Sequence, residues 1–136
     1  MPSSQDLKDV GLKTTLPRLR ILAILEENAQ RHFSAEDVYK TLIDADEEIA
    51  FATVYRVLTQ FEDAGLVLRH NFEGGRSVFE LDRGQHHDHM LCVKCNVVTE
   101  FVDEEIEKRQ NAVAKKYNFD LQDHSLYMYG VCSNCQ

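Results

Sequence analysis

Residues 51–67 read FATVYRVLTQFEDAGLV, and this stretch decides the fold of the first half of the chain. Four apolar residues recur in it at intervals of three and four, as on one face of a helix: Val54, Val57, Leu58 and Phe61. Gly65 follows the last of them and is placed to end the helix. The stretch therefore predicts a helix over about residues 51–64 that is buried along one side.

Two further helices are expected upstream of this one. Thr15 can cap the first, and Pro17 suits its first turn because a missing N–H costs nothing there. The apolar stripe of this helix is Ile21, Leu22 and Leu25. The second begins at residues 34–37, SAED, a capping box with Asp in place of Glu, and Val38 and Leu42 follow at helical spacing.

Downstream, residues 66–82 read LVLRHNFEGGRSVFELD, in which two β-prone runs flank the hairpin turn signal at residues 73–75. Three helices, the last two separated by a short turn, followed by a hairpin form the pattern of a winged helix-turn-helix. A generic small α+β domain is the alternative. The order and lengths of the elements favour the winged helix.

The second half, which begins within residues 81–86, contains all four cysteines and four of the six histidines, His86 included. It predicts a β-rich stretch over residues 89–102, a helix over about residues 103–118, and a second β-rich stretch over residues 119–132. A unit of about 50 residues buries little core by itself, so we expect it to need a metal, a partner subunit or both. We place the domains at residues 1–82 and 83–136.

Net charge is −8, from 15 basic and 23 acidic residues, which argues against a general nucleic-acid coat protein. The charge is uneven, since residues 26–48 hold eight acids and two bases, whereas residues 1–25 hold four bases and two acids. A locally basic surface can act within a Debye length of about 8–10 Å. The chain has neither an apolar run long enough to cross a membrane nor a secretory signal, so we expect a cytoplasmic protein without a membrane partner.

The cysteines form two Cys-x-x-Cys pairs: Cys92 with Cys95, and Cys132 with Cys135. A reducing cytosol disfavours structural disulfides, and two such turns can complete a tetrahedral thiolate shell around Zn(II). A thiol redox pair or a disulfide is the alternative. The doubled spacing favours structural zinc.

Residues 86–89 read HHDH, the most informative run for chemistry. In an extended strand His87 and His89 would share one face, and His86 and Asp88 the other, so the run can supply two metal sites. Further ligands could come from five residues: His32, Glu80, Glu100, Glu107 and His124. Each of these taken singly is more readily an ordinary surface residue, whereas the cluster favours metal binding. Imidazole and carboxylate donors suit Fe(II), Mn(II), Co(II) or Zn(II), so such a site exchanges its ion more easily than a thiolate shell.

These residues resemble the ferric uptake regulator (Fur) family of bacterial metal-responsive repressors, nearest to its iron-sensing branch. The matching stretches are GLKTTLPR (11–18), RHFSAEDVY (31–39), FATVYRVLTQFEDAGLV (51–67), GGRSVFEL (74–81), HHDHMLCVKC (86–95) and CSNC (132–135). The resemblance implies an α+β protein, with an N-terminal winged helix-turn-helix domain followed by a small α/β dimerisation domain.

The resemblance also implies three metal sites. Structural Zn(II) would be held by Cys92, Cys95, Cys132 and Cys135. Regulatory Fe(II), for which Mn(II), Co(II) or Zn(II) can substitute, would be held by His32, Glu80, His87, His89 and Glu100. An additional site would use His86, Asp88, Glu107 and His124.

The implied partner is double-stranded operator DNA, bound by a homodimer, with a tetramer left open. By resemblance Tyr55 and Arg56 contact bases with Ala52 and Thr53 nearby, Lys13 reaches the minor groove, and Arg18 lies near phosphate. From the residues themselves, Arg56 and Tyr55 are equally well an ordinary surface charge and a half-buried aromatic. The implied function is metal-dependent repression of iron uptake and homeostasis genes.

Two alternatives remain at this point. A sibling regulator could sense manganese, nickel, zinc or peroxide, although the peroxide branch tends to carry Asp at the positions of Glu80 and Glu100, and the zinc branch a regulatory Cys that is absent here. A metallohydrolase is more remote, because a His/Asp site can activate water but the ligands span two lobes and no constellation dedicated to a substrate accompanies them. We therefore expect the protein not to be an enzyme.

Overall fold

The computed structural model describes residues 4–27, 32–84 and 86–136. They fall into two compact units, Met1–Gly84 and Gln85–Gln136. Both helices and sheets are present, and the chain is an α+β protein, as the sequence predicts. Within the described part of the chain, no helix is long and apolar enough to span a membrane.

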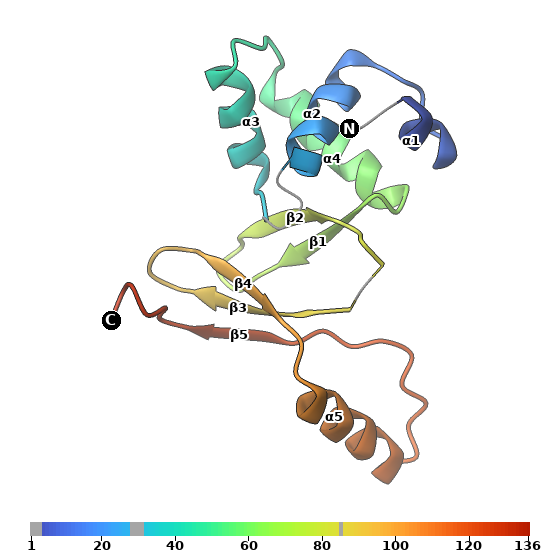
Figure 1. Ribbon diagram of the computed structural model, residues 1–136, viewed down its shortest axis with the longest axis vertical. Helices are drawn as coiled ribbons and strands as arrows, with labels where there is room; N and C mark the ends of the chain where they lie inside the picture. Colours follow the sequence, from blue (N-terminus) through green and yellow to red (C-terminus); the bar gives the residue numbers. More distant parts are fainter. Residues whose placement is uncertain (1–3, 28–31, 85) are drawn as a thin grey trace. The chain divides into compact units, whose positions relative to one another are not determined.

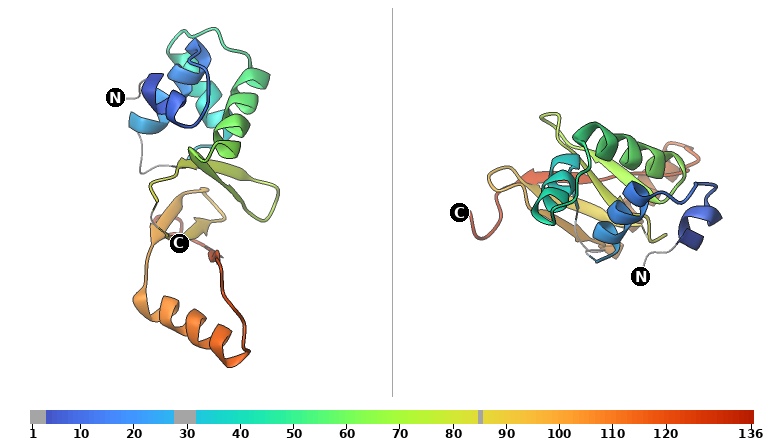
Figure 2. Two further views of the ribbon diagram at one scale, coloured as in Figure 1. Left: turned by 90° about the vertical axis from the view of Figure 1, so that its right-hand side faces the viewer. Right: turned by 90° about the horizontal axis from the view of Figure 1, so that it is seen from above.

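The first unit is built from four helices and a hairpin among its described residues (Figure 1). The helices are α1 Ser4–Asp9, α2 Leu16–Glu27, α3 Ala35–Asp44 and α4 Phe51–Asp63. The hairpin pairs β1 Val67–Asn71 antiparallel with β2 Ser77–Leu81. Figures 1 and 2 show α2, α3 and α4 gathered on one side of this hairpin, which is the arrangement of a winged helix.

The core of this unit joins the stripes that the sequence predicts. Its buried side chains come from α2 (Ile21, Leu22, Leu25), α3 (Val38, Leu42), α4 (Val54, Val57, Leu58, Phe61) and the hairpin (Val67, Phe79). The core also takes in Leu7 of α1, a helix that was not predicted from the sequence. Six residues carrying one buried leucine are too few to show a helical period, which needs a window of about 11 residues.

The ends of these helices follow local chemistry. Ser34 Oγ accepts from Asp37 N at 3.1 Å and Asp37 Oδ2 accepts from Ser34 N at 3.0 Å, so the predicted capping box forms. Thr15 Oγ1 accepts from Arg18 N at 3.4 Å at the start of α2. Gly65 follows α4 with φ of +82°, a left-handed conformation that a residue with a Cβ rarely adopts. The predicted helix therefore stops where the sequence places its end.

The second unit contains a sheet in the order β4-β3-β5 and the helix α5. The strands are β3 Asp88–Cys92, β4 Val98–Phe101 and β5 Tyr127–Gly130; β3 pairs antiparallel with β4 and parallel with β5. Helix α5 spans Glu104–Lys116, and the N–H groups of Glu105 and Ile106 both donate to its N-cap Asp103. Figures 1 and 2 show α5 lying apart from the sheet.

This unit buries little apolar surface. None of the side chains of α5, a helix that the structure describes in full, is buried. Val113, Tyr117 and Phe119 are 47%, 73% and 64% exposed. The β-rich stretch expected over residues 119–132 forms a strand over Tyr127–Gly130, and residues 119–126 connect α5 to it without strand pairing.

Candidate functional site

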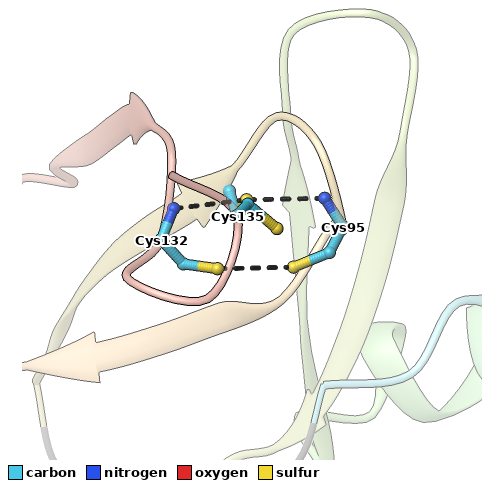
Figure 3. A group of neighbouring side chains, drawn as sticks. Cys95, Cys132 and Cys135 are labelled. Carbon is cyan, nitrogen blue, oxygen red and sulfur yellow. Dashed lines mark hydrogen bonds between the residues drawn. The ribbon is translucent and has the colours of Figure 1, made fainter.

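The four cysteines converge in the second unit on two tight turns. Cys92 ends β3, and Asn96 adopts φ of +66° as its N–H donates to Cys92 O at 2.9 Å, which closes the first turn. Cys135 N donates to Cys132 O at 3.0 Å and closes the second. Figure 3 shows the sulfurs of Cys95 and Cys132 facing each other, 3.7 Å apart. The turns thus bring residues 40 positions apart in the chain into one cluster.

The cluster fits a tetrahedral zinc ion. Zn–S bonds of about 2.3 Å place tetrahedral sulfurs about 3.8 Å apart. The Cys95–Cys132 separation of 3.7 Å agrees with this, and the four Sγ atoms all lie within 4.8 Å of one another. A shell of four thiolates leaves no open position, so it can hold an ion permanently but not bind a substrate.

The thiol pKa values show why this cluster favours a cation. The N–H groups of Cys132 and Cys95 donate to Cys92 Sγ, both at 3.4 Å, and they lower the pKa of Cys92 to about 6. Hydrogen bonds with the sulfurs of Cys132 and Cys95 instead raise the pKa of Cys135 to about 12. Neighbouring thiolates repel one another, so full deprotonation of the cluster needs a compensating positive ion.

A second group of donors lies in the same unit and mixes nitrogen with oxygen. Glu107, in the first turn of α5, bridges two histidines, with Oε1 3.1 Å from His86 Nε2 and Oε2 3.0 Å from His124 Nε2. His86 Nε2 also lies 3.2 Å from Oδ1 of the buried Asp88. The ligand atoms of all four residues lie within 4.8 Å of one another, which suits a divalent ion.

The opposite face of β3 carries a third donor group. His89 pairs with Glu100 of β4 in the strand register, and His87 Nε2 lies 3.4 Å from Glu100 Oε1. The rings of His87 and His89 are 4.9 Å apart. Side chains alternate along an extended chain, so His87 and His89 separate from His86 and Asp88.

In the first unit, His32 and Glu80 lie together. His32 Nε2 is 2.8 Å from Glu80 Oε2, and His70 Nε2 is 2.7 Å from Glu80 Oε1. The structure therefore brings His32 and Glu80 together in one unit and His87, His89 and Glu100 together in the other. His70, which lies on β1, was not predicted from the sequence. The register pairs Leu68 with Glu80 and His70 with Val78, so His70 and Glu80 lie on the same face of the hairpin. The turn signal at residues 73–75 could have found it, because a turn at this place sets the register of the two strands.

Helix α4 presents the residues expected to meet DNA. Tyr55 is 48% exposed, Arg56 and Ala52 are exposed, and Arg56 Nη2 lies 3.5 Å from Thr53 Oγ1. Side chains of this kind can read base edges in a major groove.

Arg18 connects the start of α2 to the same helix. Its Nη1 donates to Lys13 O at 2.8 Å and its Nη2 to Gln60 Oε1 at 3.0 Å. Lys13 itself is exposed. Arg18 therefore holds the backbone that carries Lys13 against α4.

Known proteins resemble this chain over nearly its whole length. The profile of the ferric uptake regulator family matches residues 9–129. A ferric uptake regulation protein of Legionella pneumophila is 61% identical over 136 residues, which cover 100% of both chains.

Solved structures give the same result. The ferric uptake regulator of Vibrio cholerae is 60% identical, with a TM-score of 0.89 over 95% of this chain and 98% of that one. A ferric uptake regulator of Francisella tularensis, solved with iron, is 40% identical, with a TM-score of 0.88 over 92% and 95% of the two chains. The extent of these matches establishes the family, and this chain belongs to the ferric uptake regulators.

Proposed function

We propose that this chain is a metal-dependent transcriptional repressor that binds operator DNA and controls iron uptake and homeostasis genes, with Fe(II) as co-repressor. One observation carries the proposal. Groups of nitrogen and oxygen donors, separate from the thiolate cluster, occur in a chain whose first unit is a winged helix. Relatives named ferric uptake regulation protein, and one solved with iron, support it.

The thiolate cluster takes the structural role. Cys92, Cys95, Cys132 and Cys135 would hold Zn(II), which ties β3 to the end of the chain. In a unit with so little buried apolar surface, this crosslink supplies stability that packing does not.

The regulatory ion would be held by His32 and Glu80 from the first unit with His87, His89 and Glu100 from the second. Imidazole and carboxylate groups of this kind suit Fe(II), and also Mn(II), Co(II) or Zn(II), so availability in the cell selects the ion. Residues from both units would share one ion, and occupancy would therefore favour the arrangement of the winged helices that fits DNA. By linkage, operator DNA tightens metal binding by the same factor.

The additional site of His86, Asp88, Glu107 and His124 joins α5 to β3. The regulatory site would draw on residues of both units, whereas this set lies wholly in the second unit. We assign it a supporting role in ordering that unit.

Operator DNA would be read from α4. Tyr55 and Arg56 would contact bases, with Ala52 and Thr53 beside them, while Lys13 reaches the minor groove and Arg18 lies near phosphate. The overall charge of −8 does not prevent DNA binding, because only charges within about a Debye length of the bound DNA act on it strongly.

A second copy of the chain would cover the exposed apolar side of the second unit. Residues of α5 and the segment after it line an apolar groove of about 640 Å³, among them Ile106, Val113, Tyr117 and Phe119. A homodimer places two winged helices on two half-sites of a palindromic operator. Such a protein works in the cytoplasm, where the DNA is, and catalyses no reaction.

The test is metal-dependent DNA binding by two histidine variants. An operator duplex is first selected from a random pool by the Mn(II)-loaded protein. Each protein is then titrated into this duplex anaerobically, with and without Mn(II) or Fe(II). We expect His89→Ala to lose the metal-dependent part of operator binding while its zinc content is unchanged, and His124→Ala to retain a metal response.

The reverse pattern, with the response lost in His124→Ala and kept in His89→Ala, would move the regulatory role to the additional site. Equal binding by stripped and loaded wild-type protein would refute the proposed function. A hydrolytic screen of the loaded protein addresses the metallohydrolase alternative, and turnover above a metal-only blank would support it.

A further inference from the structure

Arg69 of β1 contacts three side chains on one side of α4. Its Nη1 donates to Tyr55 Oη at 3.3 Å and its Nη2 to Thr59 Oγ1 at 3.1 Å. Its Nε lies 3.1 Å from Glu62 Oε1. The three partners are spaced four and three residues apart, so they form one stripe along the helix.

The guanidinium also lies near two aromatic rings. It lies 4.8 Å from the centroid of the Phe79 ring and 5.5 Å from that of Tyr55. Phe79 is buried and faces Arg69 across the hairpin register. The planar fork of Arg matches several acceptors at once and stacks on aromatic rings, which Lys cannot reproduce. Arg69 is therefore held in one orientation by three side chains of α4 and by Phe79 of the core.

Tyr55 gains its orientation from this arrangement. Its side chain is 48% exposed, so packing fixes it only in part. The hydrogen bond to its hydroxyl and the guanidinium near its ring favour this orientation of the ring over others. A side chain that is ordered before binding does not lose that freedom on binding.

We propose that Arg69 is a specificity-determining positioning residue that holds Tyr55 of α4 in the orientation that meets an operator base. The inference rests on the proposed function, in which Tyr55 reads DNA. Arg69 acts through Tyr55, and its own N–H groups are directed at protein acceptors instead of phosphate.

The experiment compares Arg69→Met, Tyr55→Phe and the double variant in the full-length, Mn(II)-loaded protein. Affinity is measured by fluorescence anisotropy for the selected operator duplex and for a scrambled duplex of the same composition. We expect Arg69→Met to lower the operator-to-scrambled affinity ratio about tenfold, the scale of ordering one side chain, with the scrambled affinity unchanged. The double variant should lose no more of this affinity ratio than the more damaging single variant, because both changes remove the same Arg69–Tyr55 interaction.

Two matched variants separate positioning from simple stability. Glu62→Gln weakens the ion pair with Arg69 but leaves the Tyr55 contact, so it should lower the melting temperature while keeping the affinity ratio. Arg69→Lys retains the charge and should recover the ratio only in part. Should Arg69→Met fail to fold, Tyr55→Phe combined with Arg69→Lys provides the same cycle.

Three outcomes would overturn the inference. If Arg69 contacted phosphate directly, Arg69→Met would weaken binding to both duplexes equally and reduce the slope of affinity against salt concentration by about one. If Arg69→Met keeps the operator-to-scrambled affinity ratio but melts at a lower temperature, Arg69 has only a structural role. If the losses of affinity ratio in the two single variants add up in the double variant, Arg69 and Tyr55 act independently. A wild-type protein without metal-dependent discrimination would instead refute the proposed function itself.

Discussion

At the scale of single residues, Glu80, a proposed metal ligand, is a buried carboxylate in contact with two histidines. One oxygen lies 2.7 Å from His70 Nε2, and the other lies 2.8 Å from His32 Nε2. His70 in turn stacks on Phe72 at an interplanar angle of 16°. The ring of His70 thereby fixes which oxygen of Glu80 faces His32. Groups behind a ligand set the orientation in which it meets the ion.

His70→Phe should therefore weaken Mn(II) binding about 10- to 100-fold, because the ring is kept but the hydrogen bond to Glu80 is lost. Anaerobic titration of Mn(II) measures this, with the Co(II) absorption spectrum as a second readout of the ligand arrangement. His70→Gln, which retains an N–H group, should recover part of the affinity. Wild-type affinity in His70→Phe would exclude this role for His70.

At the scale of elements, the sequence predicts what depends on local pattern. The stripe of α4, the capping box of α3 and the turn at residues 73–75 each follow from neighbours in the chain, and all three form as expected. The alternation along residues 86–89 is likewise enough to sort two donor groups, whose roles as ligands stay predictions. Contacts that depend on how elements pack, such as Arg69 with Tyr55, leave no mark in local pattern.

The capping box of α3 gives a direct test at this scale. Ser34→Ala removes one of its two reciprocal hydrogen bonds and should cost about 1 kcal/mol of stability. For a domain of this size that is a melting temperature lower by about 4–8 °C, measured by circular dichroism. Thr41→Ala on the same helix is the control, since Thr41 Oγ1 bonds to Asp37 O within an exposed turn and its loss should be close to neutral. Equal losses in the two variants would show that the cap contributes nothing specific.

At the scale of the whole molecule, the two units differ in what holds them together. The first has a continuous apolar core drawn from four helices and a hairpin among its described residues. The second has Leu91 and Cys92 as its buried apolar side chains among the residues described. We therefore expect the second unit to depend on zinc and on its partner copy, as the size of this half predicts.

Cys92→Ser tests that dependence, because Cys92 Sγ accepts N–H groups from both cysteine turns. The variant should lose its zinc and the cooperative melting of the second unit, and the protein should become monomeric. Metal analysis and sedimentation velocity measure the two effects. Ser133→Ala, an exposed change within the second turn, should leave both unchanged. A stable, zinc-free dimer of Cys92→Ser would rule out the structural role.

The exposed apolar residues of α5 and of the segment after it affect the abundance that the protein can reach in a cell. In the proposed homodimer, a newly synthesised copy would display Val113 of α5, with Tyr117 and Phe119 just after the helix, to chaperones and proteases until another copy covers them. Pairing depends on the square of concentration, so scarce copies are degraded disproportionately and abundant ones are protected. Helix α5 would thus give repressor abundance a lower threshold, below which turnover removes the protein before it can pair.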